Sequence, residues 1–186
     1  MEKKMDRRQR KSRDAILGAF TRLLSKKSFD KITVAEILEE ADVGRATFYA
    51  HFETKDYLLK ELCEELFGHI FQAEEGGASH TKVFDCDKEG DVFLNLFWHV
   101  KEDEKRLGKL FTNDTTGLFL GYFKAGVQGL IVKHSADFSA KKPQGVPEEF
   151  WINHLTATFI ETLRWWIERG MKLSAESICA YYLSVV

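Results

Sequence analysis

A varied group of hydrogen-bond donors lies within eleven residues of the chain. It combines a guanidinium, a hydroxyl, a phenol, an imidazole and an ammonium group, at Arg45, Thr47, Tyr49, His51 and Lys55. Such groups donate to phosphate oxygens, and an arginine can also donate two parallel hydrogen bonds to the edge of guanine. Two apolar residues, Phe48 and Phe52, lie among them one helical turn apart. The pattern indicates a short helix that buries one face and offers donors on another.

The motifs that mark common catalytic and metal sites do not occur in the sequence. There is no GxSxG elbow, phosphate-binding loop, HExxH or CxxC. No two histidines have the i, i+4 spacing of a helical metal site. The three cysteines, Cys63, Cys86 and Cys179, are widely separated, as is typical of reduced thiols. We therefore expect no enzyme, no catalytic residue, no metal site and no cofactor.

Charge is unevenly distributed along the chain. Residues 1–60 contain 14 Lys and Arg against 10 Asp and Glu, whereas the remaining residues contain 13 against 19. The front of the chain is therefore the part expected to contact a polyanion. No apolar stretch reaches the roughly 20 residues that cross a bilayer, and the charged segment from Glu2 to Arg13 does not resemble a secretory signal. We expect a cytoplasmic protein that does not enter a membrane.

Three helices are predicted before residue 54, and the second and third of them are short. Apolar residues recur at three and four positions between residues 7 and 24, which predicts an amphipathic helix. Thr33 and Glu36 have the spacing of a capping box, which predicts a second helix over residues 33–40. Asp42 and Gly44 suit a tight turn before a third helix at 45–52. Two short helices joined in this way form a helix-turn-helix, so residues 1–54, with their basic arm, are predicted to be an N-terminal domain.

Residues 55–186 are predicted to form a helical regulatory and dimerisation domain. A long helix should begin at Thr54, a helix-capping residue, and end near residue 76. Further helices are expected over 91–102, 103–111, 115–133, 148–169 and 174–185, with loops over 73–90 and 135–147. Ser174 can cap the last helix, and Gly170 can end the one before it. The predicted fold class is all-α, with about nine helices and no strands.

The N-terminal segment resembles a known family. Residues 32–59 read ITVAEILEEADVGRATFYAHFETKDYLL, which looks like the DNA-binding signature of TetR-type transcriptional regulators. The resemblance covers residues 10–62 and implies an all-α homodimer with a divergent ligand-binding body. Near the C-terminus, RWWIERG at 164–170 and SAESICAYYL at 174–183 are similar to a subgroup that includes dihydroxyacetone-kinase-operon activators.

The resemblance implies a set of residues that contact DNA. Arg45, at the start of the recognition helix, is expected to read a guanine; the alternative is a phosphate contact. Gly44 departs from the Ser or Thr common in relatives, so it supplies no side-chain cap and one DNA contact is expected to be missing. The residues matching DNA-contact positions are Thr33, Gly44, Arg45, Ala46, Thr47, Tyr49, His51 and Lys55. The basic arm at residues 3–13 either adds phosphate or minor-groove contacts or is a solvated tail.

The body is rich in aromatic residues, which commonly line pockets between helices. For each of them the alternative is a place in the core. The residues expected at a ligand pocket are Phe67, Phe71, Phe93, Phe97, Trp98, His99, Phe119, Tyr122 and Phe123.

The helix predicted at 148–169 is apolar around much of its circumference, so part of it could face a second copy of the chain. The residues expected at the dimer interface are Leu155, Phe159, Leu163, Trp166 and Tyr182. Half of these could instead face their own body.

These observations predict a sequence-specific DNA-binding regulator, with a repressor favoured over an activator. Two heads one helical turn apart, about 34 to 36 Å, would bind a palindromic operator in double-stranded DNA. A small-molecule effector in the body would control the spacing of the heads. The alternative is a DNA-binding protein whose body binds a protein partner; an exposed apolar patch would favour it.

Overall fold

The computed structural model describes residues 7–74, 92–108, 110–111 and 117–186. Within these ranges the chain forms nine α-helices, two single turns of other helix types and no strand, which confirms the predicted all-α class. The first part of the basic arm, most of the predicted loop at 73–90 and the first residues of the helix predicted at 115–133 lie outside the described residues. None of the described helices is both long enough and apolar enough to cross a membrane.

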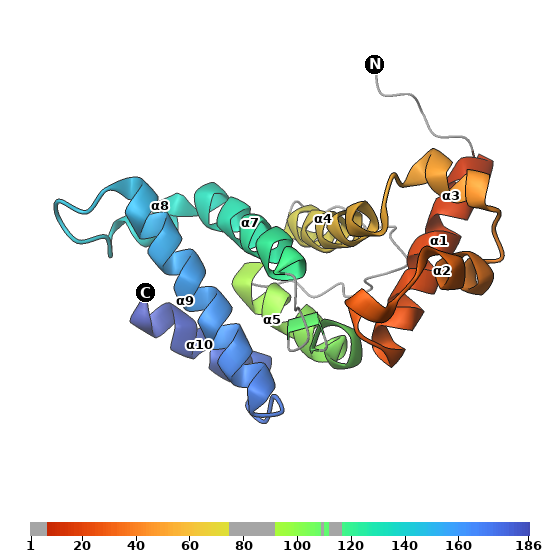
Figure 1. Ribbon diagram of the computed structural model, residues 1–186. Helices are drawn as coiled ribbons and strands as arrows, with labels where there is room; N and C mark the ends of the chain where they lie inside the picture. Colours follow the sequence, from red (N-terminus) through yellow and green to blue (C-terminus); the bar gives the residue numbers. More distant parts are fainter. Residues whose placement is uncertain (1–6, 75–91, 109, 112–116) are drawn as a thin grey trace, which may run out of the picture.

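The first three α-helices pack together at one end of the molecule (Figure 1). They are α1 (Arg7–Lys26), α2 (Val34–Ala41) and α3 (Arg45–His51), with a 3-10 turn, η1 (Phe29–Lys31), between the first two. We call these elements the head. Its core consists of residues that are almost fully inaccessible to solvent, including Phe20, Ile37, Phe48 and Phe52. Phe48 and Phe52 are therefore the inward face of the short helix, as their spacing predicts.

The ends of α2 follow from its sequence. The hydroxyl of Thr33 accepts a hydrogen bond from the amide of Glu36, and the Glu36 carboxylate accepts one from the amide of Thr33, which confirms the capping box. The helix ends at Asp42, whose φ of 51° places it in the left-handed region. Gly44 has φ −75° and is extended. The turn between α2 and α3 therefore depends on Asp42 and not on the flexibility of Gly44.

The helix α4 (Lys55–Glu74) extends from the head to the rest of the chain (Figure 1). Thr54 caps it, because its hydroxyl accepts from the amide of Tyr57 at 3.0 Å. Helix α4 packs against α7 (Leu118–Lys133) and α5 (Val92–Glu102). The contact with α7 is close: a Cβ atom on Gly126 would lie 2.2 Å from the ring of Phe67. Glycine at this position therefore lets the two helices approach each other.

The C-terminal helices form the far end of the molecule (Figure 1). They are α8 (Ser135–Ser139), α9 (Glu148–Glu168) and α10 (Ala175–Val185). Helix α9 packs on α7 and α10, and α10 packs on α5. Ser174 caps α10 by accepting from the amide of Ser177, and Gly170 follows α9 with φ 67°, both as predicted. The division at residue 54 into two domains stays a prediction.

Two elements differ from the expectations. The loop predicted at 135–147 begins with α8, one short helix that Phe138 anchors through an edge contact with Phe93 at 5.5 Å between ring centroids. The amphipathic piece predicted at 103–111 contains a π-helical turn, η2 (Glu104–Gly108). Elements this short show too few periods to be recognised from apolar spacing.

Candidate nucleic-acid interface

Helix α3 is the exposed edge of the head. Its inner side is held by Phe48, while Arg45, Ala46, Tyr49 and Ala50 are exposed to solvent. Tyr49 is an aromatic side chain with 51% of its surface accessible, although an edge contact with Phe48 fixes one side of its ring. An arginine and a phenol held outward on a short helix can reach the base edges and phosphates of a DNA groove.

The start of α1 lies beside α3. A hollow of about 440 Å³ separates the two helices, and both contribute to its walls. The residues that line it are Arg8, Gln9, Ser12, Ala46, Thr47, Ala50 and His51. Arg7, Arg8, Arg10 and Lys11 are exposed along this end of α1. The basic segment therefore places positive charge next to the candidate recognition helix.

His51, the last residue of α3, contacts α1. Its Nε2 atom lies 2.7 Å from the hydroxyl oxygen of Ser12. Partial burial, and then the positive charge of Arg13, lower the pKa of His51 below its usual value. Sequence reasoning identified His51 but missed Ser12, because 39 residues separate the two positions.

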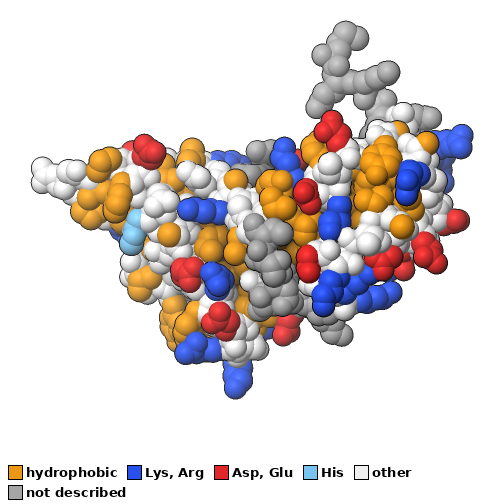
Figure 2. All heavy atoms as spheres, in the orientation of Figure 1, with side chains coloured by type: hydrophobic (Ala, Val, Ile, Leu, Met, Phe, Trp, Pro, Cys, Tyr) orange, Lys and Arg blue, Asp and Glu red, His pale blue; other side chains and the backbone are white. Residues whose placement is uncertain are grey.

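Thr33 is exposed at the start of α2, but its hydroxyl already takes part in the capping box and donates to Glu36 at 2.8 Å. Glu36 in turn pairs with Lys27, the residue that follows α1. Across the α1 and α2 end of the molecule, acidic and basic side chains lie next to each other (Figure 2). A phosphate contact at Thr33 would therefore use the amide end of α2 in preference to the hydroxyl group.

Gly44 is the N-cap of α3 and offers no side-chain cap, as expected. A Cβ atom built on it would meet nothing within 4 Å. Neither the backbone conformation nor its surroundings therefore require glycine at this position.

Lys55 is held by the head. Its Nζ atom donates to the carbonyl oxygens of Phe29 and Ile32, both at 2.9 Å, and lies 4.2 Å from the centroid of the Phe29 ring. Burial is the main cause that lowers the pKa of Lys55, against the opposing influence of Asp56 and Asp30. Two of the three ammonium protons are therefore used to fix the start of α4, and one remains for the predicted phosphate contact.

A second ion-pair group joins the head to α4. Arg13 of α1 donates to Glu61 at 2.5 Å and also to Glu65, with all three side chains mostly buried. Burial raises the pKa of Glu65, although Arg13 opposes this effect. The first helix of the head and the helix that leads to the body are thus coupled through charge as well as through apolar packing.

The residues expected at a ligand pocket fall into two aromatic clusters of the body. Phe67, Phe119 and Phe123 contact one another or Phe111, with centroid distances of 4.8 to 5.6 Å. Phe93 and Phe97 both pack on Phe159.

The other predicted pocket residues are less uniform. His99 is buried at 5% exposure, Tyr122 is partly buried, and Trp98 donates its indole N–H to Glu176 at 2.9 Å. The side chain of Phe71 lies outside the described residues. The five described phenylalanines of this set are thus buried and take part in aromatic contacts in the core.

The five residues expected at a dimer interface are buried inside one chain, which corrects that expectation. The side chains of Leu155, Phe159, Leu163, Trp166 and Tyr182 are at most 1% exposed. Trp166 and Tyr182 also satisfy their polar atoms internally, on the carbonyl oxygens of Leu173 and Leu155. Because α9 is apolar on most of its circumference, both its inner and its outer face are candidates for a dimer interface. The apolar spacing in the sequence picked out the residues of the inner face.

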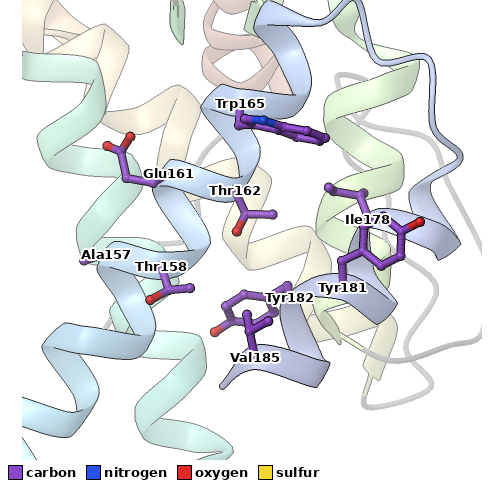
Figure 3. A pocket seen from close by; sticks show the side chains of 9 residues that line it. All are labelled: Ala157, Thr158, Glu161, Thr162, Trp165, Ile178, Tyr181, Tyr182 and Val185. Carbon is purple, nitrogen blue, oxygen red and sulfur yellow. The ribbon is translucent and has the colours of Figure 1, made fainter.

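The outer faces of α9 and α10 remain apolar and exposed. Trp165, Tyr181 and Val185 are 41%, 55% and 69% exposed, and they border an open groove of about 570 Å³ between the two helices (Figure 3). Ala157, Thr158, Glu161 and Thr162 form the α9 side of this groove, and Ile178 and Tyr182 complete the α10 side. We call this surface the α9–α10 face; sequence reasoning expected Tyr182 and Val185 at a dimer contact but missed Trp165 and Tyr181.

Known proteins resemble the chain over both of its parts. Residues 16–62 match the model of bacterial regulatory proteins of the tetR family, and residues 87–185 match that of a transcriptional regulator C-terminal region. A TetR transcriptional regulator from Streptococcus agalactiae 2603V is 32% identical, with 97% of this chain and 96% of that one covered and a TM-score of 0.72.

More distant structures share the fold alone. The dihydroxyacetone kinase operon activator DhaS is 22% identical, covers 94% of this chain and 93% of its own, and has a TM-score of 0.64. The regulator FadR from Bacillus subtilis, solved in complex with stearoyl-CoA, is 17% identical over 92% of this chain and 95% of its own, with a TM-score of 0.62.

Among curated proteins, the uncharacterized HTH-type transcriptional regulator YxbF of Bacillus subtilis is 27% identical over 80% of this chain. The match covers 46% of YxbF, and a second match covers 51% of a Haemophilus influenzae regulator. The chain thus spans about half the length of these relatives.

The head, with its exposed α3, belongs to the helix-turn-helix class. The chain is a member of the tetR family of bacterial regulatory proteins, which confirms the resemblance carried by residues 32–59. The matched proteins are transcriptional regulators and not enzymes.

Proposed function

We propose that the chain is a sequence-specific DNA-binding repressor that acts as a homodimer and responds to a small molecule. The observation that carries this proposal is the exposed polar face of α3, presented next to the basic start of α1 in a tetR-family head. An exposed helix with few bulky side chains fits the major groove, and flanking cations bind its phosphates.

Within this interface one group of residues contacts the DNA bases and another group contacts the phosphates. Arg45 reads a guanine from the start of α3, and Ala46, Thr47 and Ala50 leave room for close approach to the groove. Tyr49, His51 and the remaining N–H of Lys55 hold phosphates, together with the amide ends of α2 and α3 at Thr33 and Gly44. This division separates contacts that confer sequence preference from contacts that confer affinity.

The homodimer forms through the α9–α10 face, with a second copy of the chain as its occupant. Trp165, Tyr181 and Val185 present a large apolar surface there, and exposed apolar patches of this kind mark association sites. A two-fold axis through this face would pack two helices from each copy together. The head lies away from α9 and α10, so both heads would remain available for the two halves of a palindrome (Figure 1).

Effector control is supported by the way α4 is held. Phe67 of α4 packs on Phe123 and Gly126 of α7, so a molecule that parts these rings also displaces α4. Because α4 is tied to the head through Arg13, the spacing of the two heads would change with it. FadR, which shares this fold, has been solved with stearoyl-CoA. A differential affinity of a few kcal/mol for one geometry is sufficient to shift operator occupancy.

Control by a protein partner is the second candidate, because the α9–α10 face would suit an apolar protein surface as well as a second copy. If the protein remains a dimer at low concentration and this face is buried in it, a protein partner cannot bind there.

Selection of bound DNA from a random pool, with purified protein at physiological salt, tests the proposal. We expect a palindrome whose half-sites lie about ten base pairs apart. The Arg45→Ala variant should yield the same palindrome with one degenerate position in each half-site. Recovery of no motif, with binding that disappears at modest salt, would contradict sequence-specific regulation.

A further inference from the structure

The contact between Ser12 and His51 constrains where protons lie at the edge of the candidate DNA surface. The hydroxyl oxygen of Ser12 is 2.9 Å from the carbonyl oxygen of Gln9, 3.2 Å from that of Arg8 and 2.7 Å from Nε2 of His51. Both Ser12 and His51 line the hollow between α1 and α3 and are partly buried. Three partners therefore share one serine hydroxyl group.

The number of protons decides the direction of each hydrogen bond. A hydroxyl carries one proton, and a carbonyl oxygen can only accept. The nearer carbonyl, that of Gln9, lies where a helical serine donates to the preceding turn. When the Ser12 proton is given to the Gln9 carbonyl, the Ser12 oxygen has only lone pairs left for His51, and Nε2 of the imidazole is then the donor.

This arrangement limits what His51 can offer to DNA. A neutral imidazole has a proton on one nitrogen and a lone pair on the other. With the proton on Nε2, the second nitrogen, Nδ1, is an acceptor and cannot donate to a phosphate oxygen. A hydrogen bond from Nδ1 to phosphate requires a second proton on the ring.

We propose that Ser12 is a positioning residue that holds neutral His51 in the Nε2–H tautomer, so that the DNA phosphate contact of His51 takes up a proton. The inference rests on the proposed function, in which His51 holds a phosphate. It adds a residue from α1 to the DNA-binding machinery and a dependence of affinity on pH.

The charges around His51 favour the neutral ring in the free protein. Arg13 is the cation that acts on it from α1, and Arg8 lines the same hollow. From α4, Glu61 and Glu65 both pair with Arg13. Partial burial and Arg13 together keep the pKa of His51 low in the absence of DNA.

A bound phosphate reverses this balance, because an anion beside the ring stabilises the imidazolium and raises its pKa in the complex. Affinity should therefore be highest below the free-protein pKa and fall as pH rises through the pKa of the complex. Because each head takes up one proton, this decline can be at most about tenfold in affinity per pH unit for each head.

The test measures the binding of a mixed-sequence DNA duplex at constant low ionic strength between about pH 5.5 and pH 8, where histidines titrate. Wild type and Ser12→Thr, which keeps the hydroxyl, should show the same decline of affinity with rising pH. Ser12→Ala releases the ring to adopt the Nδ1–H tautomer and should flatten the profile while retaining binding. His51→Gln should flatten it too, whereas His154→Gln, an exposed histidine on α9, should not.

Ring-nitrogen NMR shifts of His51 in the free protein provide a readout that does not depend on DNA. We expect the proton on Nε2 in wild type and in Ser12→Thr, and on Nδ1 or shared between both nitrogens in Ser12→Ala. A proton on Nδ1 in wild type, or identical pH profiles for wild type and Ser12→Ala, would overturn the inference. Loss of DNA binding in every protein including wild type would instead overturn the proposed function.

Discussion

Arg13 of α1 and Glu61 of α4 form an ion pair, with 2.5 Å between Nη2 and Oε2, at the point where the head meets the helix that leads to the body. Arg13 also pairs with Glu65, so one guanidinium satisfies two carboxylates. Because only 12–22% of each side chain is exposed, removing the cation leaves two poorly solvated negative charges next to each other.

We therefore predict that Arg13→Met lowers the free energy of unfolding by about 1–2 kcal/mol, as measured by urea denaturation. Arg22→Met is the matched control, since Arg22 is 54% exposed where it pairs with Glu40. That variant should lose less than about 0.5 kcal/mol. Equal losses for the two variants would show that the Arg13 pair contributes no more than a surface contact.

Gly44→Ser should stabilise the head and strengthen DNA binding. The backbone at Gly44 is extended, and a Cβ atom there meets nothing within 4 Å, so serine fits without strain. Its hydroxyl can cap α3, which is worth a few tenths of a kcal/mol relative to glycine, and can donate to a phosphate. Thermal melting and duplex binding measure the two effects. Gly44→Ala, which lacks the hydroxyl, should gain neither; a gain in Gly44→Ala equal to that in Gly44→Ser would contradict the capping argument.

The stability of the head should depend on Glu36 at acid pH. The hydrogen bond from Lys27, followed by those from Thr33, lowers the pKa of Glu36 from 4.5 to about 2. A carboxylate whose pKa is lowered by folding contributes stability that is present above pH 4.5 and is lost as pH falls towards 2.

The corresponding measurement compares wild type with Glu36→Gln by denaturation at several pH values. The difference between the two proteins should be constant at neutral pH and shrink steadily below about pH 4.5. A difference that stays unchanged down to about pH 2 would exclude the charge of Glu36 as its source.

Much of the head was predictable from sequence because its signals are local. The capping box of Thr33 and Glu36 and the spacing of Phe48 and Phe52 each specify structure within a few residues. The contact of Ser12 with His51 and the two carbonyl bonds of Lys55 join positions distant in the chain, so no periodicity reveals them. For α9, apolar residues on both faces made the pattern ambiguous, and only tertiary packing shows that Trp166 is buried while Trp165 is exposed.

The α9–α10 face should determine the oligomeric state. Val185→Glu places a carboxylate on this face, where burial against a second copy would leave it without a partner. We expect its dimer dissociation constant, measured by analytical ultracentrifugation, to rise by more than about tenfold. Val132→Glu, at a valine of α7 that is 52% exposed, is the matched control and should dimerise normally. If Val185→Glu and Val132→Glu dimerise equally well, the dimer interface lies elsewhere on the chain.

In the proposed function, the exposed face of α3 recognises bases through Arg45 and contacts the DNA backbone through Tyr49. The most direct test of these two roles measures the affinity of wild type, Arg45→Ala and Tyr49→Phe for the selected operator and for every single-base-pair variant of one half-site. We predict that Arg45→Ala loses discrimination of about 1–3 kcal/mol at one base pair and that Tyr49→Phe weakens binding to all sequences alike. If Arg45→Ala instead weakened binding equally on every sequence, Arg45 would be a backbone contact and the assignment of base reading to it would be wrong.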